Sequence, residues 1–148
     1  MKHFSEYYRW ALGVIDRSGV VQDRSSLHRQ HVSRTEGIVR APRAGGFAKP
    51  GASLEGLIFV DDAVLRFEER IVIERDGTIL QVFYSYHYQR PNGWYFRYDK
   101  LENPLDDTAK AIIEPQCHLH VAQDVPRFKT HTTNLAEMLD LIKHNFYT

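Results

Sequence analysis

Residues 84–99 read YSYHYQRPNGWYFRYD, two runs of alternating aromatic and polar residues joined by the turn sequence RPNG. Proline suits the second position of a type I turn, asparagine suits the third, and glycine suits the left-handed position that follows. A three-residue loop of this kind pairs Arg90 with Trp94. The stretch therefore predicts an antiparallel β-hairpin whose register is set by its turn.

The register sorts the side chains of this hairpin onto two faces, because successive residues of a strand point in opposite directions. We expect His87 opposite Arg97 on one face. Ser85 and Asp99 form the next pair on that face. The other face is aromatic and comprises Tyr84, Tyr86, Tyr88, Trp94, Phe96 and Tyr98. Histidine, arginine and aspartate can exchange protons and bind an anion. An ordinary solvated face of an antiparallel sheet is the alternative interpretation.

A second hairpin precedes the first, and in it the strand sequences AVLRFEERIVIE and TILQVFYSYHYQ flank Arg-Asp-Gly. A two-residue Asp-Gly turn pairs Arg75 with Thr78. The pairs that then follow are Ile71 with Val82, Glu69 with Tyr84, Glu68 with Ser85, Phe67 with Tyr86 and Arg66 with His87. This register joins the apolar faces of the two hairpins, and it adds Arg66 and Glu68 to the polar face.

The same register leaves Glu69 as a carboxylate on an otherwise apolar face, where it needs a partner such as a tyrosine hydroxyl or an arginine. A slip of one residue would instead bring Glu69 beside Phe83 and near Ser85. The first register gives the cleaner apolar face, so we favour it. Both Glu68 and Glu69 stay candidates for a polar site.

The remaining elements complete an α+β pattern. Residues 4–16 and 134–146 carry apolar residues at helical spacing, and Asn134 with Glu137 has the spacing of a capping box. LIFVDD and CHLHVA are shorter strand patterns. We therefore predict an α+β domain, an antiparallel meander sheet of about four to six strands with an N-terminal and a C-terminal helix.

A basic segment follows the first helix. Between Arg24 and Pro50 the only acid is Glu36, whereas arginine, glycine and proline recur. We predict a mobile basic loop at about 22–52 within a single domain, 1–148. Arg40 and Arg43 in this loop are candidate phosphate contacts, and an ordinary solvated loop is the alternative.

Composition indicates the cellular compartment and argues against a secreted or membrane-spanning protein. The 148 residues are 43% hydrophobic and carry no net charge, so charge alone gives no argument for nucleic acid. The single cysteine, Cys117, cannot form an internal disulfide and suits a reducing compartment. The N-terminus lacks the apolar core of a signal peptide, and no apolar run approaches a membrane span. We therefore expect a soluble cytoplasmic protein with no membrane contact.

Four short segments together indicate a family. They are LRFEE at 65–69, YSYHYQ at 84–89, RYD at 97–99 and PQCHLHV at 115–121. In this order they resemble the TumE-type toxins of prokaryotic toxin–antitoxin pairs, and the resemblance covers about residues 54–146. It implies a toxin that acts on RNA and is neutralised by a small antitoxin of the helix-turn-helix type.

Metal-independent RNA cleavage needs a base for the 2′-hydroxyl, an acid for the leaving oxygen and a cation for the phosphorane. His87 is the candidate base or acid, with Glu68 or Glu69 as its partner. Arg97 would hold the phosphate bidentately, and Tyr95 would stack an unpaired base.

His118 and His120 alternate by two and so project from one face of a strand. If they share the face of His87, they supply the second proton carrier. A His-x-His pair also suits a metal ion, with His87 or Asp99 as the third ligand. Two hydrogen-bonded or solvated strand histidines are the plainer alternative.

We therefore expect a toxin that is a metal-independent endoribonuclease without a cofactor. The alternatives are a non-catalytic nucleic-acid- or protein-binding module, and a metal-dependent enzyme built on the His-x-His pair. The predicted catalytic residues are His87, Arg97, Glu69, Glu68, His118 and His120. The predicted substrate contacts are Arg66, Tyr86, Tyr95, Asp99, Arg40 and Arg43. The expected partners are RNA and the antitoxin, and a homodimer is left open.

Overall fold

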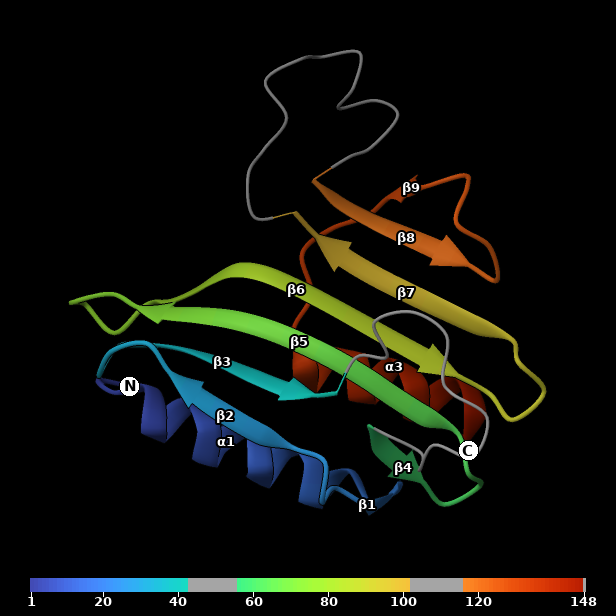
Figure 1. The fold of residues 1–148 in the computed structure, drawn as a ribbon, viewed down its shortest axis with the longest axis horizontal. Coiled ribbons are helices and arrows are strands. Elements are labelled where there is room, and N and C mark those ends of the chain that lie inside the picture. Colours follow the sequence, from blue (N-terminus) through green and yellow to red (C-terminus); the bar gives the residue numbers. More distant parts are fainter. Residues whose placement is uncertain (43–55, 102–115, 148) are drawn as a thin grey trace.

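A computed structural model describes residues 1–42, 56–101 and 116–147. Within these residues, one antiparallel sheet of nine strands carries two helices on the same face (Figure 1). The helices are α1 (Phe4–Ser18) and α3 (Leu135–Phe146). The strands are β1 (Val21–Asp23), β2 (His28–His31), β3 (Glu36–Ala41), β4 (Leu57–Phe59), β5 (Val64–Ile73), β6 (Ile79–Gln89), β7 (Tyr95–Lys100), β8 (Cys117–Val121) and β9 (Phe128–Lys129).

The sheet runs in the order β1-β4-β5-β6-β7-β8-β9, and β3 pairs with both β2 and β5. One edge of β5 is shared, because β4 pairs with its first two residues and β3 pairs with residues 67–72. The α+β prediction with a helix at each end is confirmed. The predicted count of four to six strands is too low, since it misses the short strands on the basic segment and β9.

The segment predicted as a basic loop at 22–52 contains strands in its described part. The β2–β3 hairpin pairs His28 with Arg40, and β3 then pairs with β5. Inward-facing Val39 and Ala41 are fully buried, while Arg40 between them points outward. A strand with small apolar residues inside and cations outside resembles a loop in composition, which is why the prediction fails there. Residues 43–52 of that loop lie outside the described residues.

The register of the β6–β7 hairpin is confirmed. The Arg90 N–H donates to the Trp94 carbonyl at 2.8 Å, and His87 lies opposite Arg97. In β5–β6 the pairs from Arg66–His87 to Glu69–Tyr84 are confirmed as well.

The turn between β5 and β6 differs from the prediction. Glu74 rather than Arg75 pairs with Thr78, at 2.9 Å, around a loop closed by Gly77 with φ of 86°. A glycine accepts this left-handed conformation without steric cost. The resulting loop of three residues shifts the pairing of β5 with β6 by one residue. An irregularity after Arg70, where the pairing skips Val82, restores the predicted register. The predicted pairs Arg75–Thr78 and Ile71–Val82 are therefore wrong, whereas the pairs beyond the irregularity stand.

The core lies between the helices and the aromatic face of the sheet. From α1 it takes Phe4, Tyr7, Ala11 and Ile15, and from α3 it takes Leu135, Met138, Leu139 and Ile142. From the sheet it includes Leu65, Phe67, Ile71, Tyr84, Tyr86, Tyr88 and Phe96. Each large apolar side chain buried in this way contributes roughly 1.5–3 kcal/mol. Helix α3 begins at an Asn134 cap, whose side chain accepts the Glu137 N–H at 2.9 Å.

Glu69 lies in this core and is fully buried. The Tyr7 hydroxyl donates to one carboxyl oxygen at 2.6 Å, and the Tyr86 hydroxyl donates to the other at 2.5 Å. Burial raises the pKa of Glu69 to about 7, although the two tyrosine hydrogen bonds act in the opposite direction. Glu69 therefore joins α1 to the sheet, with the tyrosine partners that its position predicts.

We expect the stability of the protein to fall as pH rises through the range set by Glu69. The folded carboxyl has a pKa of about 7 against an ordinary value of 4.5. Its contribution is therefore complete below about pH 4.5 and is lost by about pH 7, at up to about 1.4 kcal/mol per pH unit. Glu69→Gln should flatten this part of the profile of unfolding free energy, measured by urea denaturation. Glu74→Gln, at an exposed position of the same hairpin, is the control, and equal slopes in both variants would contradict the assignment.

Candidate active site

The face of the sheet opposite the helices, called the open face here, gathers polar residues from six strands. Strand register aligns His28, Arg40, Glu68, Ser85, Asp99 and His118 in one row across β2, β3, β5, β6, β7 and β8. A second row is formed by Arg66, His87, Arg97 and His120. Pairing thus brings together side chains that lie far apart in the sequence.

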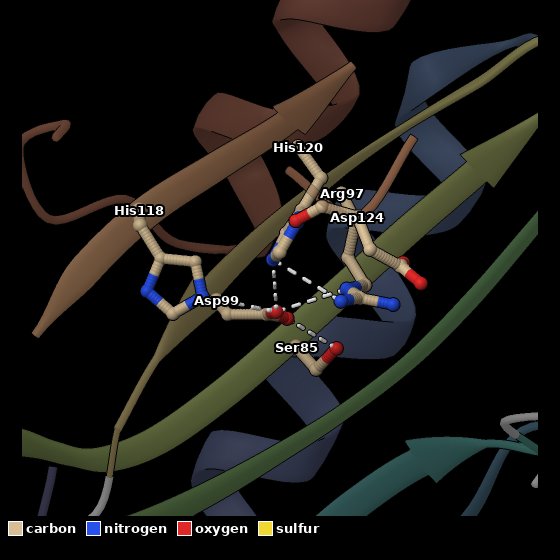
Figure 2. Close-up of polar contacts among 6 residues, drawn as sticks. All are labelled: Ser85, Arg97, Asp99, His118, His120 and Asp124. Carbon is tan, nitrogen blue, oxygen red and sulfur yellow. Dashed lines mark hydrogen bonds and ion pairs between the residues drawn. The ribbon is translucent and has the colours of Figure 1, made fainter. Parts of the chain in front are cut away.

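Asp99 is the hub of the densest part of these rows (Figure 2). Its Oδ1 accepts the Ser85 hydroxyl at 2.6 Å, and its Oδ2 accepts Arg97 Nε at 2.9 Å. The Nε2 atoms of His118 and His120 lie 3.5 and 3.2 Å from the same Oδ2. Burial alone would raise the pKa of Asp99, but the bonds from His118 and Ser85 and the charge of Arg97 hold it well below its ordinary value. Asp99 is therefore a carboxylate at neutral pH.

His120 is held in one tautomer. Its Nδ1 lies 2.9 Å from the backbone carbonyl of Asp124, which can only accept, so Nδ1 carries the proton. Its Nε2 then accepts from Arg97 Nη2 at 3.1 Å. Burial and the charge of Arg97 lower the pKa of His120. The lowered pKa favours the neutral ring, whose Nε2 lies between the Arg97 guanidinium and the Asp99 carboxylate.

Arg97 is more exposed than its partners Asp99, His118 and His120. His118 and His120 are only 2% and 1% exposed, whereas the Arg97 side chain is 20% exposed. His87 is half-buried and stacks on Tyr95, with ring centroids 4.6 Å apart and planes at 17°. His87, Tyr95 and Arg97 are therefore the groups that a bound molecule would meet.

A metal ion is another ligand that this cluster could hold, besides a molecule that contacts His87, Tyr95 and Arg97. Asp99, His118 and His120 offer ligand atoms that all lie within 4.8 Å of one another. Two imidazoles and a carboxylate suit a divalent transition metal, and the contact from His120 to a backbone carbonyl is a common support for such a ligand. However, the Arg97 guanidinium contacts Asp99 and His120 and puts a positive charge among the three groups. The donor set fits a metal, while the local charge opposes it.

The structure separates the predicted site residues into groups. Most of the predicted site residues share the open face. They are His87, Arg97, Asp99, His118, His120, Arg66, Tyr95, Arg40 and Glu68. Glu69 and Tyr86 lie on the opposite, helix-covered face, so the sheet separates them from His87. Arg43 lies outside the described residues. Sequence reasoning misses His28, because its strand is hidden in a basic segment, and Asp124, because it acts through its backbone carbonyl.

Comparison with known protein families identifies the family of this chain. A family model described as Toxin TumE matches residues 13–146. The chain belongs to the TumE toxin family. The resemblance is thereby confirmed, and with it a toxin role and a cognate antitoxin as partner. The family match includes every residue of the two rows on the open face.

No curated protein and no solved structure matches this TumE family member. Neither of the helices in the described residues is long and apolar enough to cross a membrane.

If the charge of Arg97 is what opposes a metal, its removal should create metal affinity. We expect Arg97→Leu to bind Zn²⁺ at least about tenfold more tightly than the unaltered protein, because a neighbouring positive charge no longer repels the ion. Isothermal titration calorimetry measures this, and Co²⁺ absorption reports the geometry. Adding His118→Ala to Arg97→Leu should remove the gain. Equal affinity with and without Arg97 would contradict the electrostatic argument.

Proposed function

We propose that this TumE family toxin is a metal-independent endoribonuclease whose site lies on the open face. The observation that carries the proposal is the fixed guanidinium of Arg97, held by Asp99 and His120 beside a half-buried histidine. RNA cleavage by its own 2′-hydroxyl needs a cation for the phosphorane and groups that move protons. Arg97 is the cation and His87 is the group that moves a proton, and both lie on one accessible patch.

Arg97 acts as the phosphate-binding group. Its Nε is bonded to Asp99 and its Nη2 to His120, so the guanidinium plane is fixed before substrate arrives. A preorganised fork of N–H donors binds a phosphate in two places and loses little entropy on doing so. Asp99, His118 and His120 are positioning residues in this scheme: Asp99 and His120 contact Arg97, and the buried His118 contacts Asp99.

His87 carries a proton to or from the RNA. It lies directly across the hairpin from Arg97, so both side chains meet one phosphate. Glu68 is its partner, because it pairs with Ser85 and therefore sits diagonally from His87 on the same face, about 7–8 Å away between Cα atoms. Of the two adjacent carboxylates, Glu68 fits this role because Glu69 is fully buried under the helices. Tyr95, stacked on His87, extends the patch for an unpaired base.

The antitoxin partner is proposed to be of the small helix-turn-helix type, which rests on the family resemblance. A homodimer stays a prediction.

A metal-dependent enzyme is the second candidate, favoured by the donor set of Asp99, His118 and His120. A non-catalytic binding module is the third. The three differ in how cleavage responds to chelation and to loss of His87.

We expect the purified protein to cleave mixed cellular RNA in the presence of EDTA. His87→Ala should lower the rate by roughly 100-fold or more, as for loss of a positioned acid or base. Arg97→Gln should lower it as well, while His131→Ala, at an exposed position outside the site, serves as the control. RNA gels and single-turnover rates measure these effects. Loss of cleavage in EDTA would move the assignment to the metal site, and an absence of cleavage by folded protein would leave the binding module.

A further inference from the structure

A hollow lies on the open face, three strands away from Arg97. It is lined by His28, Arg40, Pro42 and Glu68 and has a volume of about 410 Å³. Arg40 Nε donates to His28 Nε2 at 2.7 Å, and the Arg40 side chain remains 42% exposed. The histidine is itself fixed, because its Nδ1 lies 3.0 Å from the carbonyl of Ser26. An exposed guanidinium is therefore held in place here, as Arg97 is in the first cluster.

A second hollow adjoins this one. It is lined by Ile38, Glu68, Arg70 and Phe83 and measures about 230 Å³. Glu68 belongs to both hollows and lies 3.9 Å from Arg40, so it marks their common wall. Arg70 is tied to Glu36 by bonds of 3.0 and 2.8 Å, which leaves Phe83 and Ile38 as the surface for an apolar ring. A cation beside an aromatic platform is the combination that holds a nucleotide of single-stranded nucleic acid.

We propose that these two hollows form a second nucleotide subsite, in which Arg40, held in place by His28, binds a phosphate and Phe83 stacks the adjacent base. The proposal rests on the proposed ribonuclease function and names its substrate class, a single strand of several nucleotides. Arg40 lies on β3 and Arg97 on β7, with β5 and β6 between them. Three strand spacings amount to about 14 Å, so one nucleotide does not reach both cations.

The groups between the two cations suit the path of such a strand. Arg66 on β5 and His87 on β6 lie side by side in register, and His87 lies beside Arg97. Arg40 is the diagonal neighbour of Arg66, because it pairs with Glu68 two residues further along β5. Each of the four adjacent strands therefore contributes a basic side chain to the open face. A duplex would hide its bases from Phe83, so the surface favours a single strand.

Binding rather than cleavage is the direct test. Fluorescence anisotropy would be measured with 2′-O-methyl oligoribonucleotides, which the proposed mechanism cannot cleave, of two, four and six nucleotides. We expect affinity to rise at least about tenfold from two to four nucleotides, since a second phosphate and base are engaged. Arg40→Gln should abolish most of this rise. It should also reduce the slope of log affinity against log salt by about 0.7, the value for one phosphate contact in a single strand.

The base contact has its own readout. Phe83→Ala should weaken binding of a tetranucleotide, and an oligonucleotide that lacks the base at the second subsite should bind the unaltered protein and Phe83→Ala equally. Arg24→Gln is the matched control, because Arg24 pairs with Asp16 of α1 at 2.8 Å, away from the rows of the open face. Circular dichroism checks that each variant is folded. If Phe83→Ala fails to fold, the binding data for Arg40→Gln alone test the subsite.

Two results would overturn the subsite. One is affinity that does not change from two to six nucleotides. The other is an Arg40→Gln loss that is the same for every length, as a diffuse charge effect would give. If the protein cleaves cellular RNA and either result is also observed, the ribonuclease proposal is retained and only the subsite is rejected. Length-dependent binding that Arg40→Gln abolishes, without any cleavage, supports the subsite and removes the catalytic proposal.

Discussion

The register of β6 against its two neighbours is the constraint on which the open face depends. A slip of one residue would turn every side chain of β6 to the opposite face. Tyr84, Tyr86 and Tyr88 would then leave the core, at a cost of roughly 1.5–3 kcal/mol for each large side chain. The same slip would carry Ser85 and His87 under the helices, where neither would meet Asp99 or Arg97. Burial of the aromatic face thus fixes the polar face as well.

Two adjacent carboxylates show what this alternation does to chemistry. Glu68 and Glu69 are neighbours on β5, yet one lies in a solvent-accessible hollow and the other is fully buried. Glu69 finds two tyrosine hydroxyls and joins α1 to the sheet. Glu68 faces Arg40 and the open face. The two positions therefore serve stability and the candidate site, respectively, although the residues are chemically identical.

The open face uses buried groups to fix accessible ones. Asp99 and His120 are shielded, and both hold Arg97 at the edge of solvent. At the other side of the sheet, half-buried His28 holds Arg40. Fixing a guanidinium in advance reduces the entropy that binding of a phosphate would otherwise cost. The two fixed cations lie on the same face of the sheet, as the proposed binding of a single RNA strand requires.

Turn chemistry, which is local, allowed the sequence by itself to determine the β6–β7 register. The alternation of apolar and polar residues indicated the pairs around Glu68 and Glu69, although the turn predicted before them was wrong. The segments near them also indicated the toxin family. Only the tertiary structure decided the strand count, the β2–β3 hairpin and the position of His28, because pairing between distant strands depends on burial that composition does not reveal. It also decided that Gly77 closes a longer turn, and that the irregularity at Val82 compensates for it. Finally, it separated Glu69 and Tyr86 from His87, since the side of a sheet that helices cover is settled by packing across the whole domain.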